Sequence, residues 1–139
     1  MNVKLTRATE IDRVSELLGL PEEINDSASL TTEIAKGLPA ESVDKFLKVM
    51  GSKPTVNIIS DRAYRRAKSE KRPISAANSQ VLFDFARAYV VADRVHSGNG
   101  VLVMRFFEKP CEDFGGAAPM ALAISSPAGA DAVIDLLNR

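Results

Sequence analysis

Apolar residues recur at intervals of three and four along most of the chain, and no segment shows sustained alternation of apolar and polar residues. The first spacing is that of one face of an α-helix, whereas a half-buried strand would require the second. The 139 residues are 45% apolar, which suffices to fill one core of this size. We therefore predict an all-α protein, built as one small helical domain.

Prolines, glycines and capping residues divide this pattern into separate helices. Helices are predicted at residues 6–20, 38–51, 59–72, 74–97, 98–110, 119–124 and 126–139. The polar run at 25–32, NDSASLTT, is interpreted as a linker. The helix at 98–110 is expected to turn three apolar side chains inward, namely Val101, Met104 and Phe107.

The helix at 74–97 carries the widest apolar stripe, which includes Leu82, Phe85 and Tyr89. One neighbouring helix cannot cover a stripe of this width. Burial from two directions and burial at a subunit interface both remain open. For the second case we expect a homodimer in which Leu82, Phe85 and Tyr89 contact the other copy.

Nothing in the chain has the spacing of a catalytic or cofactor site. Gly115 and Gly116 lack the pattern of a dinucleotide loop and the Lys-Ser/Thr of a phosphate loop. Glu112 and Asp113 beside them are of the kind that lies solvated in a polar turn. No His or Cys stands at metal-ligand spacing, and the chain has one Cys. We predict no enzyme activity, no cofactor, no metal and no small-molecule substrate.

Overall charge does not point to any partner, because 18 basic residues balance 18 acidic ones. The chain also has no 18-residue apolar run and no apolar segment of the signal-peptide kind at its start. We therefore expect a cytoplasmic protein that does not enter a membrane.

One segment, residues 62–72, is strongly basic, with six basic residues against the single acid Glu70 and a net charge of +5. A solvated helix face would explain this composition. A helix that contacts the phosphates of operator DNA would explain it equally well. For the second interpretation the contacting residues are Arg62, Tyr64, Arg65, Arg66 and Lys68.

The end of the chain reads FFEKPCEDFGGAAPMALAISSPAGADAVIDLLNR, residues 106–139. This stretch resembles the C-terminal toxin-binding domain of the Xre/MbcA/ParS antitoxins. The matching positions are Phe107, Pro110, Gly115, Gly116, Pro119, Leu122, Gly129, Val133 and Leu137. Upstream, the segments GLPAESVDKFLKVMG, ISDRAYRRAK and ISAANSQVLFDFARAYVVADRV are similar to the entry helix, recognition helix and long helix of the family.

The resemblance covers about residues 37–139 and implies three regions. Residues 1–36 form an N-terminal helical segment and linker, 37–74 a degenerate Xre-like helix-turn-helix, and 75–139 a long helix with the toxin-binding domain. The helix-turn-helix is degenerate because only SKPTVNII stands where its first helix belongs, and Pro54 disfavours a helix there.

The family implies an antitoxin that neutralises a RES-domain enzyme encoded beside it, an NAD glycohydrolase or ADP-ribosyltransferase, by covering its NAD pocket. A homodimer would then give a heterotetramer or larger complex. An apolar face on the last helix leaves its acids outward, suited to a pocket that binds pyrophosphate. The Gly-Gly pair is interpreted as a bend that lets two helices pack closely. The expected toxin contacts are Glu112, Asp113, Gly115, Gly116, Asp131, Asp135, Asn138 and Arg139.

Two other functions stay open at this point. A DNA-binding regulator without a toxin is favoured by the basic segment 62–72 and opposed by Pro54. A small enzyme is opposed by the lack of any coherent catalytic set.

Overall fold

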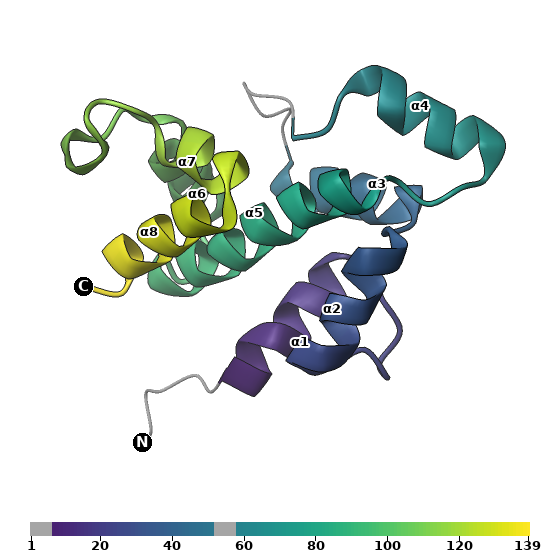
Figure 1. The fold of residues 1–139 in the computed structure, drawn as a ribbon. Coiled ribbons are helices and arrows are strands. Elements are labelled where there is room, and N and C mark those ends of the chain that lie inside the picture. The colour runs from purple at the N-terminus through teal and green to yellow at the C-terminus, as the bar shows by residue number, and fades with distance from the viewer. Residues whose placement is uncertain (1–6, 52–57) are drawn as a thin grey trace.

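The computed structural model describes residues 7–51 and 58–139, and in this part the protein is all-helical without strands, as predicted (Figure 1). Its elements are α1 (Arg7–Leu17), α2 (Ser27–Lys36), α3 (Ala40–Met50), α4 (Asp61–Glu70), α5 (Ala76–Val95), α6 (Gly100–Glu108), the 3-10 helix η1 (Glu112–Phe114), α7 (Pro119–Ser125) and α8 (Pro127–Leu137).

Helix α5 runs through the centre of the molecule (Figure 1). The α1–α2 hairpin packs on it, and so do α6, α7 and α8 from the C-terminal part. Helix α4 stands apart and packs mainly on α3. The long helix expected at 74–97 is thus confirmed as α5, and α6, α7 and α8 form where helices were predicted at 98–110, 119–124 and 126–139.

An aromatic cluster joins α3, α5 and α6 at the core. The ring centroids of Phe46 and Phe85 lie 5.4 Å apart, and those of Phe85 and Phe107 lie 4.9 Å apart. Tyr89 meets the edge of Phe46 at 5.5 Å. Such tilted and edge-to-face pairs are favourable beyond the area that they bury. The cluster therefore holds three helices that are distant in the sequence.

The predicted subunit interface on α5 is wrong. Leu82, Phe85 and Tyr89 are 1%, 0% and 5% exposed within a single chain. Helices of the same chain cover the stripe from more than one direction, which was the other possibility. These three side chains are therefore not available to a second copy of the chain.

The predicted linker at 25–32 is also wrong, because α2 begins there. Asp26 and Ser29 form a capping box, in which the Ser29 backbone N–H donates to Asp26 Oδ1 at 2.8 Å. Leu30 and Ile34, four residues apart, supply the buried face. The polar composition was misleading because Ser and Thr lie on the exposed side of the helix.

Two further expectations concern α6 and the helix-turn-helix. Met104 and Phe107 are buried as predicted, but Val101 lies in the first turn of α6 and is exposed. The segment with Pro54 falls outside the described residues, so the degenerate helix-turn-helix stays a prediction.

The N-cap of α4 is Ser60, whose hydroxyl accepts a hydrogen bond from the Ala63 N–H at 3.1 Å.

We predict that Phe85→Ala lowers the free energy of unfolding by about 3–5 kcal/mol, because it opens a cavity among fully buried rings. Leu47→Ala on the partly exposed side of α3 is the control, and its effect should be clearly smaller, about 1 kcal/mol. Urea denaturation followed by circular dichroism measures both. A Phe85→Ala protein of unchanged stability would show that α5 is not the centre of the core.

Candidate functional site

The turn between α6 and α7 is closed by its own backbone. The Gly116 N–H donates to the Cys111 carbonyl at 2.9 Å, and the Cys111 N–H donates to the Ala117 carbonyl at 3.1 Å. Gly115 and Gly116 have φ angles of 65° and 91°, in the left-handed region that favours glycine. The Gly-Gly pair is thus needed for the path of the backbone, which fixes Glu112 and Asp113 at the outside of the turn.

The glycine that permits close helix packing is a different one. A Cβ at Gly115 or Gly116 would meet nothing within 4 Å, so the interpretation of this pair as a close-packing bend is wrong. A Cβ at Gly129 would lie 2.1 Å from the Leu122 carbonyl oxygen and 2.8 Å from Ser125 Oγ. Gly129, in the first turn of α8, therefore lets α8 fold back tightly on α7.

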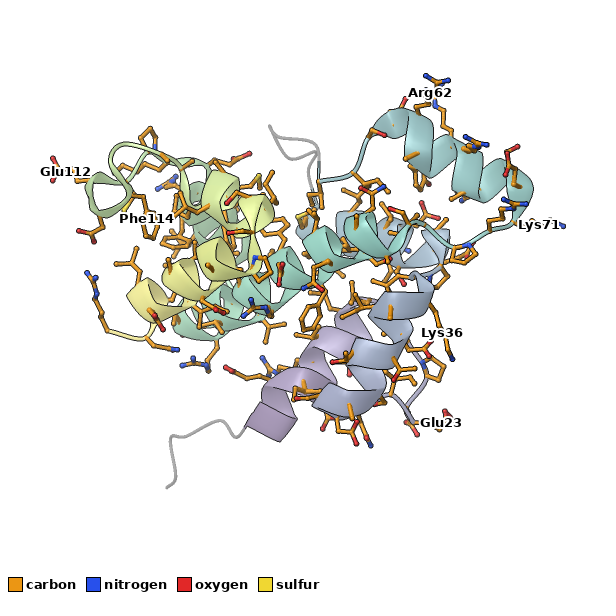
Figure 2. All side chains as sticks on the ribbon, in the orientation of Figure 1. Glu23, Lys36, Arg62, Lys71, Glu112 and Phe114 are labelled. Carbon is orange, nitrogen blue, oxygen red and sulfur yellow. The ribbon has the colours of Figure 1, made fainter. Side chains whose placement is uncertain are left out.

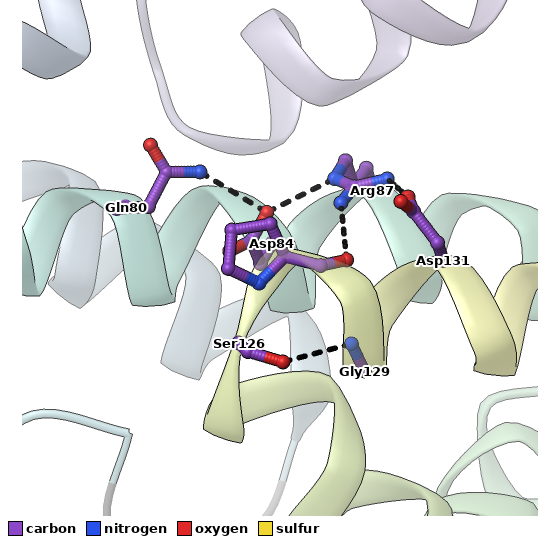
Figure 3. Close-up of polar contacts among 7 residues, drawn as sticks. Gln80, Asp84, Arg87, Ser126, Gly129 and Asp131 are labelled. Carbon is purple, nitrogen blue, oxygen red and sulfur yellow. Dashed lines mark hydrogen bonds and ion pairs between the residues drawn. The ribbon is translucent and has the colours of Figure 1, made fainter.

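Arg87 of α5 makes three polar contacts, two of which fix the start of α8 (Figure 3). Its Nη1 lies 2.7 Å from Asp131 Oδ1, and its Nη2 donates to the Pro127 carbonyl at 3.1 Å. Its Nε donates to Asp84 Oδ1 at 3.1 Å. One guanidinium thus connects a buried acid of α5 to two positions on α8.

Asp84 is buried in the apolar surroundings of α5, and Gln80 Nε2 also donates to its Oδ1 at 3.1 Å. Burial raises the pKa of this carboxyl, although Gln80 and Arg87 act in the opposite direction. Neither Asp84 nor Arg87 was identified as a candidate from the sequence. Their spacing of three, with Gln80 four residues before Asp84, was the available signal.

The far end of α8 is held by a second arginine and by the turn. Arg94 of α5 donates through Nη2 to Asn138 Oδ1 at 2.7 Å and through Nε to Glu10 of α1 at 3.2 Å. Arg139 Nη1 lies 3.3 Å from Asp113 Oδ2. Asp113 of the turn and Arg139 after α8, both predicted contact residues, therefore lie side by side.

All four polar candidates of α8 are exposed, as their spacing predicted. Asp131 and Asn138 are engaged by Arg87 and Arg94, however. Among the side chains that the structure describes, those of residues 10–51 and 58–139, none forms a hydrogen bond or ion pair with the side chain of Asp135 or Glu112, and Glu112 projects from the outer edge of the turn (Figure 2). These two acids are the ones most available to a partner.

The basic helix α4 is exposed but partly neutralised. Arg65 pairs with Asp61 at 3.1 Å, and Arg66 pairs with Glu70 at 3.2 Å. Lys68 Nζ lies 2.9 Å from Asp44 Oδ2. Of the predicted DNA contacts, Arg62 alone has no acidic partner in the part of the chain that the structure describes.

Tyr64 is half-buried and donates to Asp44 of α3, so its ring and hydroxyl hold α4 against α3. This hydrogen bond raises the pKa of Tyr64, and the one from Lys68 to Asp44 raises the pKa of Lys68. Burial opposes ionisation of Asp44, yet the bonds from Tyr64 and Lys68 keep its pKa below the ordinary value. Tyr64 is thus occupied in packing inward.

A hollow of about 420 Å³ lies between α4 and the first turn of α5. Arg62, Arg66 and Arg72 contribute to its lining, together with the capping residue Ser75. Arg72 and Arg66 share Glu70, at 3.6 and 3.2 Å. Arg62 and Lys71 lie at the end of the molecule opposite to Glu112 (Figure 2).

Within the described residues, no helix combines the length and apolarity needed to cross a bilayer. The same residues contain no group of three or more His, Cys, Asp or Glu side chains arranged to hold a metal ion. The sequence matches no protein-family model and no curated protein with which it was compared.

We predict that Arg87→Ala lowers the free energy of unfolding at pH 7 by about 3 kcal/mol, because Asp84 is then left buried without its cationic partner. Arg65→Ala, which removes the exposed pair with Asp61, should cost at most about 1 kcal/mol. Urea denaturation compares the two. Adding Asp84→Asn to Arg87→Ala should recover part of the loss, and equal effects of the two single variants would contradict the role of Arg87.

Proposed function

We propose that the chain is an antitoxin that binds a RES-domain, NAD-consuming enzyme and blocks its NAD pocket. The observation that carries this proposal is the surface formed by Glu112, Asp113, Asp135 and Arg139, which we term the anionic end. Asp113 and Arg139 join the turn to the segment just after α8 at 3.3 Å, and Asp135 lies in the last turn of α8.

The chemistry of the anionic end suits such a target. It holds three carboxylates and one guanidinium, so its net charge is negative. An enzyme that binds NAD holds the pyrophosphate with cationic groups, which would attract this surface.

Rigidity supports the same proposal. Arg87 and Arg94 tie α8 to α5, and five backbone hydrogen bonds of 2.9–3.2 Å close the turn from Cys111 to Ala117. A surface that is already ordered loses little conformational freedom on binding. The anionic end therefore fits inhibition by insertion of a preformed element.

Charge reversal of the anionic end tests the proposal. We expect Asp135→Lys and Glu112→Lys each to weaken inhibition at least about tenfold, because like charges then face each other across the interface. Both side chains are exposed, so the fold should be unchanged. Glu23→Lys, far from this end in Figure 2, is the matched control. The readout is NAD consumption by the purified RES-domain product of the neighbouring reading frame, titrated with antitoxin.

Charge reversal is preferable to truncation, because removing Asn138 and Arg139 also removes their contacts with Arg94 and Asp113. Full inhibition by both reversed variants would place the inhibitory surface elsewhere on the chain. Lack of inhibition by the intact chain, or lack of a RES-domain neighbour, would remove the antitoxin function itself.

The alternative function is DNA binding by α4, and the hollow with Arg62, Arg66 and Arg72 favours it. Three guanidinium groups around one hollow suit phosphate oxygens. This surface lies opposite the anionic end, so one chain could use both (Figure 2).

For DNA binding we expect affinity for the upstream DNA to fall steeply with salt. Arg62→Ala should reduce the slope of log affinity against log salt by about 0.9, the value for one lost phosphate contact. Arg13→Ala on α1 should leave the slope unchanged. A mobility-shift assay at low salt measures this, and the absence of any shift, with or without toxin, would leave α4 as a solvated face.

A further inference from the structure

A groove of about 540 Å³ is formed jointly by the α1–α2 hairpin, α5 and α8. The hairpin contributes Ile11 of α1 and Ser27 of α2, and α8 contributes Ile134 and Asp135. Asp135 of the anionic end therefore also lines a groove that the N-terminal hairpin helps to build.

Much of the lining of this groove is apolar. Val14 of α1 and Val91 of α5 are 3% and 2% exposed and form its buried part. Three larger side chains from three different helices line it and stay partly exposed, namely Ile11, Phe83 and Ile134. A single exposed apolar residue is ordinary, but several that share one concave surface are typical of a binding site.

The charged side chains of the groove are one cation, Arg87, and three acids, Glu10, Asp131 and Asp135. Arg87 is already engaged by Asp84 and Asp131 of the same chain. Asp135 forms no hydrogen bond or ion pair with any side chain that the structure describes. The groove therefore combines apolar surface with an acid that can pair with a cation from outside.

We propose that this groove is the docking site for a basic, amphipathic segment of the RES-domain partner. An apolar side chain of that segment lies against Ile11, Phe83 and Ile134, and a lysine or arginine beside it pairs with Asp135. The proposal rests on the antitoxin function proposed above and extends it, because the groove receives a segment of the enzyme whose NAD pocket the anionic end covers.

Charge complementarity favours this occupant. An enzyme that binds NAD holds the pyrophosphate with cationic groups, so basic side chains are expected at the edge of its pocket. Asp135 belongs to both the anionic end and the groove, which places the groove within reach of that edge.

The groove gives the α1–α2 hairpin a role in recognition. The resemblance to antitoxins covers about residues 37–139, whereas Ile11 and Ser27 lie before this stretch. An interface discriminates between partners through contacts that the wrong partner cannot satisfy. The hairpin therefore contributes to the choice of toxin.

Isothermal titration calorimetry of the intact chain with the purified RES-domain product of the neighbouring reading frame tests the proposal. We expect Ile11→Lys to raise the dissociation constant at least about tenfold, because it places a cation opposite the cation of the partner. Leu17→Lys is the same change at a partly exposed apolar residue of α1 outside the groove. It should leave the dissociation constant within about twofold. Circular dichroism checks the fold of both variants.

Ser27→Lys tests the groove even if Ile11→Lys fails to fold, because Ser27 is exposed at the start of α2. It should also weaken binding, since it adds a cation to the groove. Thr32→Lys, at an exposed residue of α2 outside the groove, is its control. Equal affinities of these two variants would overturn the proposal.

The outcomes separate the groove from the antitoxin function. Unchanged affinity of Ile11→Lys and Ser27→Lys, with Asp135→Lys still impaired in inhibition, would overturn the groove alone. Absence of binding by the intact chain would remove the antitoxin function and the groove assignment together. Self-association of the chain that Ile11→Lys abolishes, measured by sedimentation velocity, would assign the groove to a second copy and overturn the proposal as well.

Discussion

Helix α5 is apolar around most of its circumference, and the other helices of the fold cover this apolar surface. The hairpin of α1 and α2 and the group of α6, α7 and α8 both pack on this one helix. The aromatic cluster of Phe46, Phe85, Tyr89 and Phe107 then links α3 and α6 to it. Since fully buried rings leave no room to shift, the positions of these helices are set by α5.

Asp84 is the one charged side chain in the core formed by the described residues, and its pairing with Arg87 fixes the position of α8. A buried carboxylate is costly unless it is paired, and Arg87 reaches both Asp84 and α8. Apolar packing alone would allow α8 to slide along α5. The contacts of Arg87 with Asp131 and the Pro127 carbonyl favour a single position of α8 on α5. The positions of the residues of the anionic end that follow on α8 depend on it.

Most of the fold could be predicted from the sequence because the helices carry local signals: a period near 3.6, serine caps such as Ser60 and Ser75, and proline in first turns. What covers each apolar face is not a local property. The stripe at Leu82 and Tyr89 looked like a subunit interface because periodicity shows that a face is apolar, not which element covers it.

The same distinction between local signals and three-dimensional packing explains which features of the candidate site could be predicted. The outward direction of Asp135 and Arg139 followed from helical spacing, whereas the pairing of Arg139 with Asp113 depends on how α8 is placed. The roles of Gly115, Gly116 and Gly129 could not be separated in the sequence. All three interrupt a pattern, but only in three dimensions does Gly129 meet the Leu122 carbonyl while the other two meet nothing.

Although the net charge is zero, acidic and basic side chains are unevenly distributed along the molecule. Glu112 of the turn lies at one end of the molecule, and Arg62 and Lys71 lie at the other (Figure 2). Such a distribution gives no net attraction to a charged partner at distances much beyond the Debye length, about 8 Å at physiological salt. At shorter range it acts on orientation, because each end attracts partners of one sign. Two partners of opposite charge can then bind without competing, which is the arrangement that a protein contacting both an NAD-binding enzyme and a phosphate backbone would require.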